Sequence, residues 1–127
     1  MKSYEVRIGN YVSYLGRLTQ ITGKDLYDDI EGRPFEGIVL TEEWLIKLGW
    51  LWNEESKTFE RYPESDGRMH LRKSLNNDTY HMFNYVLQAM IAKNIYFLHE
   101  LQNLFFALTG RELITKEIAD HVRLRQI

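Results

Sequence analysis

The sequence contains no cysteine, and this absence excludes several kinds of chemistry. Disulfide bonds, thiolate catalysis and zinc sites with cysteine ligands all need a side chain that the protein does not have. Proteins that work in a reducing compartment have no need of disulfide bonds. We therefore expect the protein to work in the cytoplasm.

Long apolar segments are also missing. No run approaches the roughly 20 apolar residues that a helix needs to span a bilayer. Residues 1–5 lead into no hydrophobic signal region. We therefore expect no membrane partner and no secretion.

An excess of positive charge is the third absence. The 127 residues include 16 Lys and Arg against 18 Asp and Glu, which gives a formal net charge of −2. A protein that binds duplex DNA by neutralising many phosphates should be more basic. A local basic patch stays compatible with this balance. The length and the hydrophobic content of 44% predict a single domain over residues 1–127.

Short runs rich in β-branched and aromatic residues predict strands in the first third of the chain. These runs cover residues 6–14, 18–21 and 35–40. The tight connection at Leu15-Gly16-Arg17 predicts a small bent sheet, for which an SH3-like barrel is one form. Residues 25–32 are acidic and polar, so we expect them to form an exposed loop.

The middle of the chain predicts a short helix followed by more strands. Thr41 is a favourable N-cap for a helix over about residues 42–48, which Gly49 ends. Residues 50–62 predict a hairpin, and residues 68–73 predict a strand because apolar and polar residues alternate there.

Residues 79–92 are ambiguous. Their apolar spacing fits a helix capped by Asp78, whereas residues 79–86 have the composition of a strand. We favour a strand through about Val86, because the preceding strands need a partner.

The strongest periodic signal lies in residues 94–110. Six apolar side chains follow helical spacing there: Phe97, Leu98, Leu101, Leu104, Phe105 and Leu108. The pattern predicts a long helix over about residues 94–109 with Leu101 and Leu104 in the core. Residues 113–127 predict a short final helix. The expected fold class is therefore α+β, a bent antiparallel sheet packed against the long helix and the short helix over about residues 42–48.

Basic side chains recur along one face of the strand predicted over residues 68–73. Arg68, His70 and Arg72 lie two residues apart, and Lys73 follows directly. Such a face could bind a nucleotide, a phosphate group or single-stranded nucleic acid. An ordinary solvated sheet face shows the same alternation, so both interpretations stay open.

Three tryptophans within nine positions form a second candidate binding feature. Strand alternation puts Trp50 and Trp52 on one face, where they could stack on a base or on a partner. We expect Trp44 to pack in the core instead.

Polar residues interrupt the apolar pattern of the long helix at His99, Gln102 and Asn103. We expect such groups to hydrogen-bond a neighbouring backbone and to hold the helix against the sheet. A role in facing a ligand is the alternative.

No catalytic or metal-binding arrangement is recognisable in the sequence. The four histidines, His70, His81, His99 and His121, are 11, 18 and 22 residues apart, so none gives the HxH or HxxxH spacing of a metal site. The acidic residues 25–31 lack the ligand order of a calcium loop. No G-x-S-x-G motif or Ser/His/Asp set occurs. We therefore expect no metal, no cofactor and no catalytic residue.

Three sequence blocks carry a resemblance to a known family. They are EVRIGNYV at residues 5–12, VLTEEWLIKLGW at residues 39–50 and LHELQNLFFALTGREL at residues 98–113. In this order they closely resemble a family of small proteins without an assigned activity, found in phages and prophage-like elements of gut Bacteroidetes. The resemblance implies a setting in the cytoplasm of a bacterial host cell. It carries over no catalytic residue.

Three classes of function stay open. The resemblance favours a non-enzymatic phage or prophage accessory protein that binds a host or phage macromolecule, with counter-defence as one setting. A protein is the first expected partner, and a homo-oligomer is compatible with the sequence. The second hypothesis is a nucleotide or nucleic-acid binder that uses Arg68, Arg72 and Lys73. The third, a small hydrolase, has no supporting residue set.

Overall fold

The computed structural model describes residues 5–27, 32–61, 69–75, 77–84 and 86–115 of the chain. These residues form two antiparallel sheets and three helices, so the predicted α+β class is confirmed. They group into two compact units. Unit 1 is Met1–Val39 with Phe97–Glu112, and unit 2 is Leu40–Tyr96 with Leu113–Ile127. A single domain over residues 1–127 stays a prediction.

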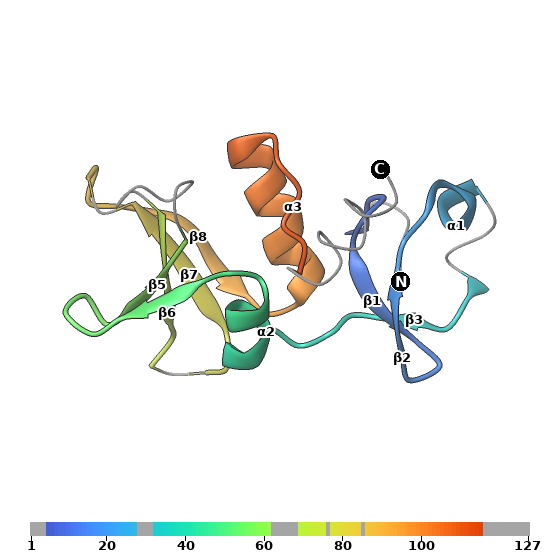
Figure 1. Ribbon diagram of the computed structural model, residues 1–127, viewed down its shortest axis with the longest axis horizontal. Coiled ribbons are helices and arrows are strands. Elements are labelled where there is room, and N and C mark those ends of the chain that lie inside the picture. The colour runs from blue at the N-terminus through green and yellow to red at the C-terminus, as the bar shows by residue number, and fades with distance from the viewer. Residues whose placement is uncertain (1–4, 28–31, 62–68, 76, 85, 116–127) are drawn as a thin grey trace, which may run out of the picture. The chain divides into compact units, whose positions relative to one another are not determined.

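The sheet of unit 1 has three strands in the order β2-β1-β3 (Figure 1). They are β1 Tyr11–Tyr14, β2 Arg17–Gln20 and β3 Phe35–Glu36. Leu15 and Gly16, with φ of 51° and 81°, form the predicted tight connection between β1 and β2. The described strands do not close into the SH3-like barrel that the sequence suggested.

The first strand begins later than the sequence predicts. Residues 6–10 are not part of it, because the N–H of Asn10 donates to the carbonyl of Arg7 at 3.1 Å and forms a turn. Gly9 lies in this turn with φ of 96°, a backbone conformation that residues other than glycine rarely adopt. The turn places the backbone of residues 9–11 beside the long helix.

A short helix, α1 at Gly23–Tyr27, occupies part of the segment predicted as a loop. Thr22 and Asp25 cap it reciprocally. The Asp25 carboxylate accepts the N–H of Thr22 at 2.9 Å, and Thr22 Oγ1 accepts the N–H of Asp25 at 3.3 Å. The loop prediction is therefore wrong for residues 25–27, and residues 28–31 lie outside the described part of the chain.

The long helix α3 spans Leu98–Thr109 and packs on β1. Gly110 ends it with φ of 73°, as predicted. The helix starts later than predicted, because the Glu100 side chain accepts the N–H of Phe97 at 2.8 Å and caps the helix there.

The buried face of α3 is narrower than its apolar pattern predicts. Its buried residues are Leu98, His99, Leu101, Gln102 and Phe105. The core position of Leu101 is confirmed. Leu104 is only half-buried and Leu108 is 45% exposed, so the predicted face is wrong at its C-terminal end.

Side chains of α3 hold the turn that precedes β1. Gln102 Oε1 accepts the N–H of Tyr11 at 2.8 Å, and Gln102 Nε2 donates to the carbonyl of Gly9 at 3.2 Å. Asn103 Nδ2 donates to the carbonyl of Glu5 at 3.2 Å. The prediction that Gln102 and Asn103 hydrogen-bond a neighbouring backbone is confirmed.

Arg7 links the same turn to the residues at the end of α3. Its guanidinium donates two hydrogen bonds to the carboxylate of Glu112, at 2.6 and 3.1 Å, and lies 4.2 Å from the ring centre of Phe106. Two parallel bonds and a stacked ring need the planar fork of arginine. The first and third sequence blocks therefore meet in unit 1.

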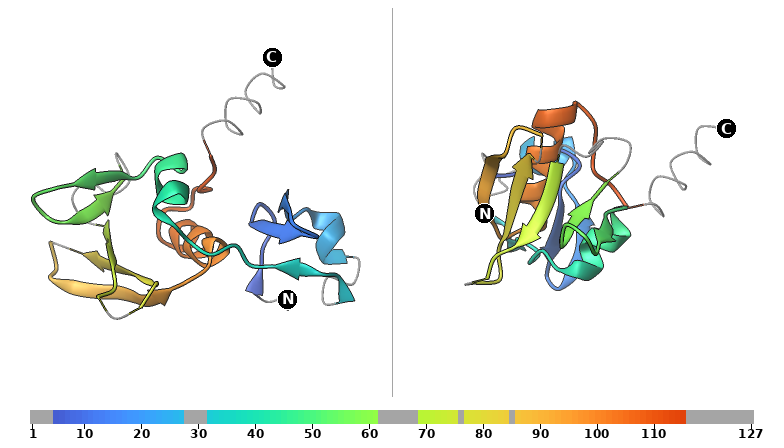
Figure 2. Two further views of the ribbon diagram at one scale, coloured as in Figure 1. Left: turned by 90° about the horizontal axis from the view of Figure 1, so that it is seen from below. Right: turned by 90° about the vertical axis from the view of Figure 1, so that its left-hand side faces the viewer.

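Unit 2 contains a short helix and a five-stranded sheet. The helix α2 spans Glu42–Lys47, and Thr41 Oγ1 caps it by accepting the N–H of Trp44 at 3.3 Å, as predicted. The strands follow one another across the sheet in chain order, each antiparallel to the next (Figures 1 and 2). They are β4 Leu51–Asn53, β5 Thr58–Glu60, β6 Met69–Lys73, β7 Tyr80–Asn84 and β8 Ala89–Ile95.

The ambiguous segment forms a strand, as we favoured, and an unexpected strand follows it. β7 ends at Asn84, whose Oδ1 accepts the N–H of Leu87 at 3.0 Å and so opens a turn. The chain returns as β8 through Ile95. Residues 94 and 95 therefore belong to this strand and not to the long helix.

One face of the sheet of unit 2 carries a hydrophobic core. Phe59, Leu71 and Met82 are direct neighbours across three strands, and each is at most 3% exposed. Residues 113–115 are not helical, and the rest of the predicted final helix lies outside the described residues. No helix in the described part of the chain is long and apolar enough to cross a membrane.

Candidate functional site

The structure does not bring the predicted basic strip together. Arg68 lies outside the described residues. His70 is 4% exposed, so the expectation that it lies on a solvated face is wrong. Arg72 and Lys73 are exposed, but successive residues of a strand point to opposite faces of the sheet. Of the described members of the strip, only Arg72 is exposed on the predicted face.

His70 belongs to a buried polar cluster on the sheet face opposite to the core. Its Nδ1 lies 2.8 Å from Thr58 Oγ1 and 3.1 Å from Glu60 Oε1. Asn53 Nδ2 donates to the same Glu60 oxygen at 3.1 Å. Thr58 and Glu60 supply polar partners for Nδ1 of His70, which allows the side chain to be buried. The alternation of apolar and polar residues in the sequence does not reveal these partners.

This cluster has the residue types of a catalytic triad without the geometry of one. In a triad the nucleophile and the carboxylate bond opposite nitrogens of the imidazole. Here the hydroxyl of Thr58 and the carboxylate of Glu60 both lie at Nδ1 of His70. Thr58 is also 0% exposed, so its hydroxyl cannot reach a substrate. The cluster therefore offers no support for hydrolysis.

The two candidate tryptophans do not share a face. Trp50 is 0% exposed and lies one residue before β4, where strand alternation does not apply. Trp52 is 48% exposed, packs edge-on against Phe59 at 5.0 Å, and donates from Nε1 to the Glu54 carboxylate at 2.6 Å. Of the pair, only Trp52 is open to a partner, and its ring already has local contacts.

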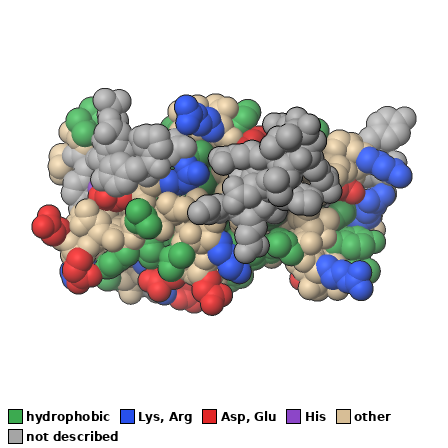
Figure 3. Space-filling view, viewed as in Figure 1, with side chains coloured by type: hydrophobic (Ala, Val, Ile, Leu, Met, Phe, Trp, Pro, Cys, Tyr) green, Lys and Arg blue, Asp and Glu red, His purple; other side chains and the backbone are tan. Residues whose placement is uncertain are grey.

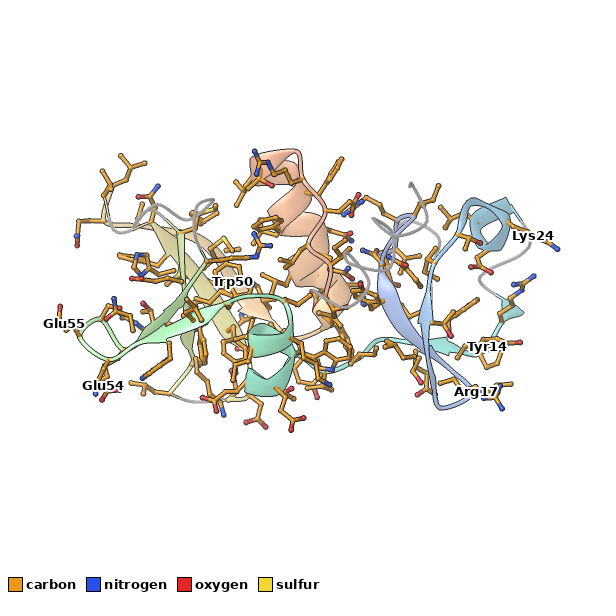
Figure 4. All side chains as sticks on the ribbon, in the orientation of Figure 1. Tyr14, Arg17, Lys24, Trp50, Glu54 and Glu55 are labelled. Atoms are coloured by element: carbon orange, nitrogen blue, oxygen red, sulfur yellow. The ribbon has the colours of Figure 1, made fainter. Side chains whose placement is uncertain are left out.

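Exposed acidic side chains lie at the tip of the β4–β5 hairpin and on α2. Glu54 and Glu55 stand at its tip (Figure 4), and Figure 3 shows further acidic side chains over α2, where Glu42 and Glu43 are exposed. A hydrogen bond from Lys57, followed by the one from Trp52, lowers the pKa of the Glu54 carboxyl. These two contacts within the hairpin explain the lowered pKa of Glu54, so no bound ligand is needed to explain it. The described residues hold no group of three or more histidines and carboxylates placed to bind a metal ion.

β8 is an exposed apolar edge strand that the sequence pattern did not predict. Among the described residues, β8 pairs with β7 alone and so forms one edge of the sheet. Apolar residues that are exposed or half-buried run from the preceding turn through this strand: Val86, Leu87, Ala89, Met90, Ile91 and Ala92. We call these six residues the β8 edge. The sequence does contain an apolar run after a turn at Asn84. The predicted long helix, however, included residues 94 and 95, which form the end of this strand.

A pocket of about 360 Å³ lies in unit 1 at the start of α3. It is lined by Glu5, Phe35, Glu36, Gly37, Phe97 and His99. His99 is 3% exposed, and its Nδ1 has no hydrogen-bond partner among the described residues. The expectation that His99 bonds a neighbouring backbone is therefore wrong, and the alternative, that it faces a ligand, stays open.

Burial lowers the pKa of His99, although the charges of Glu100 and Glu5 act in the opposite direction. The imidazole is therefore neutral near pH 7 and offers one acceptor nitrogen and one N–H donor. No family model, curated protein or solved structure matches the chain.

Proposed function

We propose that the protein is a non-enzymatic binding module that captures an extended segment of a host or phage protein by strand addition to the β8 edge. The phage setting, inside a bacterial host cell, rests on the resemblance of the three sequence blocks. Counter-defence is one use of such a module.

The β8 edge is the observation that carries this proposal. An edge strand presents backbone N–H and C=O groups in the pattern that another strand needs, and exposed apolar residues make such pairing favourable. Natural proteins usually protect an edge of this kind with charges or proline. β8 has seven residues, of which Lys93 is the only charged one, and it contains no proline.

The dimensions and chemistry of β8 describe the segment that would bind. Seven residues in a strand span roughly 23 Å at about 3.3 Å per residue. Val86, Leu87 and Met90 are 68%, 72% and 44% exposed, so the partner segment should be mainly apolar. Lys93 favours an acidic residue towards one end of that segment.

A capture experiment with charged variants tests the proposal. The parent chain and Met90→Lys would be immobilised and exposed to lysate of a Bacteroidetes host, and captured proteins would be identified by mass spectrometry. Overlapping synthetic peptides of the captured protein would then locate the bound segment. We expect Met90→Lys to weaken binding of that peptide, because a charged side chain would replace the apolar surface that packs beside the side chains of the added strand. Binding should also slow hydrogen exchange at the amides of residues 89–95.

Leu75→Lys is the matched control. Leu75 is 100% exposed in unit 2, away from β8 in sequence, and the substitution adds the same charge. This variant should bind the peptide like the parent. Equal binding by Met90→Lys, or a parent chain whose mass in solution doubles through pairing of two β8 strands, would contradict the proposal.

Nucleotide or nucleic-acid binding has less support than strand addition. That hypothesis depended on a row of cations on one sheet face, and the burial of His70 interrupts the row. Arg72 lies 6.0 Å from the ring centre of Phe83, which gives its guanidinium a contact within the sheet. No described feature favours this function over a protein partner.

A further inference from the structure

The pocket at the start of α3 has flat, rigid walls. The rings of Phe97 and His99 stack with centres 5.5 Å apart and planes inclined by 15°. Gly37 lies so close to Phe97 that a Cβ atom at this position would be 2.6 Å from the ring. Because only glycine fits there, the backbone of residue 37 holds the Phe97 ring in place. The pocket therefore offers aromatic surfaces whose positions are fixed before any ligand binds.

The charged residues around the pocket favour a ligand with a positive charge. Its lining includes two carboxylates, Glu5 and Glu36, and no lysine or arginine. Glu100 adds a third negative charge near His99. The N-terminus of a helix attracts anions, but these carboxylates oppose a phosphate or another acidic group. A neutral His99 adds no positive charge that would repel a cation.

His99 leaves one hydrogen-bonding atom unused beside this pocket. Its Nδ1 is buried and has no partner in the described part of the chain. With the imidazole proton on Nε2, Nδ1 is an acceptor, and a buried acceptor without a donor costs stability. A ligand with several N–H groups would satisfy this atom. Among cationic side chains, the guanidinium group of arginine has five N–H donors in one plane, and its flat face stacks on aromatic rings.

We propose that this pocket binds a guanidinium group, with the plane of the group against the aromatic walls and its N–H groups directed to Glu36 and His99. The ligand class is an arginine side chain or a related alkylguanidine. A lysine ammonium fits less well, because it lacks the flat face and the fork of donors. This site is independent of the β8 edge and goes beyond the proposed function.

Titration of the full chain with N-acetylarginine methylamide tests the assignment. Binding would be followed by NMR through the backbone amides of Glu36, Gly37, Phe97 and His99, with N-acetyllysine methylamide and AMP as competing ligand classes. We expect shifts at these amides with the arginine probe, weaker binding of the lysine probe and none of AMP. Removal of one charge-assisted hydrogen bond in Glu36→Gln should weaken arginine binding by about tenfold.

Glu43→Gln is the matched control, because Glu43 is an exposed carboxylate on α2 in unit 2. This variant and Met90→Lys should bind the arginine probe like the parent, which separates a failure of this site from a failure of the β8 edge. Thermal melting of each variant would confirm that it is folded. The inference is overturned if the parent gives no shifts, if Glu36→Gln binds equally well, or if AMP binds better than the arginine probe.

Discussion

His99 differs from its polar neighbours on α3. Gln102 is buried and has both side-chain atoms bonded to the backbone of residues 9 and 11, whereas His99 is buried with Nδ1 unbonded. Sequence spacing cannot separate the two residues, because both lie on the buried face of one helix. The difference arises from the turn at Gly9, which brings backbone groups to Gln102.

The depressed pKa of His99 predicts how stability depends on pH. The unfolded chain, with an imidazole pKa near 6.5, binds a proton more readily than the folded chain does. The free energy of unfolding should therefore fall as the pH drops below about 6.5, through the window down to the lowered pKa. Urea unfolding of the parent and of His99→Phe at several pH values from about 7.5 to about 5.5 checks this. The variant should lose that part of the slope, and an identical slope in both proteins would contradict the assigned cause.

At the scale of elements, local signals predicted seven of the eight described strands and two of the three described helices. The N-cap of α2 at Thr41, the end of α3 at Gly110 and the apolar spacing within α3 each depend on a few adjacent residues. α1 was missed although its Thr22–Asp25 cap is equally local, because the acidic composition of residues 25–32 outweighed it. Element type was therefore predictable wherever the local signals agreed.

For β8 and for the pocket at the start of α3, the local signals in the sequence did not agree on one prediction. Residues 89–92 of β8 are all apolar, so this strand lacks the alternation of apolar and polar residues that predicts a strand. Its register against β7 is also irregular, with shifts on both sides of Met82. The pocket combines Gly37 with Phe97, two residues that are distant in sequence and adjacent only after folding. Of the pocket, the sequence identified His99 through the alternative that it faces a ligand, but it did not identify the surfaces that surround this residue.

The narrow buried face of α3 predicts unequal effects of two similar substitutions. Leu101→Ala removes atoms from a fully buried position and should lower the free energy of unfolding by about 2–5 kcal/mol. Leu108→Ala affects a side chain that is 45% exposed and should change it by less than about 1 kcal/mol. Chemical denaturation of both variants measures the difference. Equal losses would show that the predicted apolar face, and not the structural one, describes the core.

At the scale of the whole molecule, the two units differ in how they use the chain. Unit 1 is built from Met1–Val39 and Phe97–Glu112, and the residues between them belong to unit 2. Val39 pairs with Phe97 in an isolated antiparallel bridge, so the chain leaves unit 1 and re-enters it at adjacent positions. The sheet of unit 2, in contrast, is formed by strands that are consecutive in sequence.

This difference predicts the order in which the sheets form. Contacts between residues close in sequence cost less loop-closure entropy than the contact of Gln102 with Tyr11, which are 91 residues apart. In pulsed hydrogen exchange during refolding, amides of β6 and β7 should therefore be protected before the amide of Tyr11. Simultaneous protection of both sets would mean that the molecule folds as one cooperative body.

The hydrogen bonds from α3 to the turn at Gly9 also have a consequence for protein synthesis. The N-terminal strands leave the ribosome before Gln102 has been synthesised. Until then, the carbonyl of Gly9 and the N–H of Tyr11 lack the side chain that bonds them in the folded protein. Every nascent chain passes through this stage. A chain cut short before residue 98 would therefore keep those backbone groups open to water and to proteases.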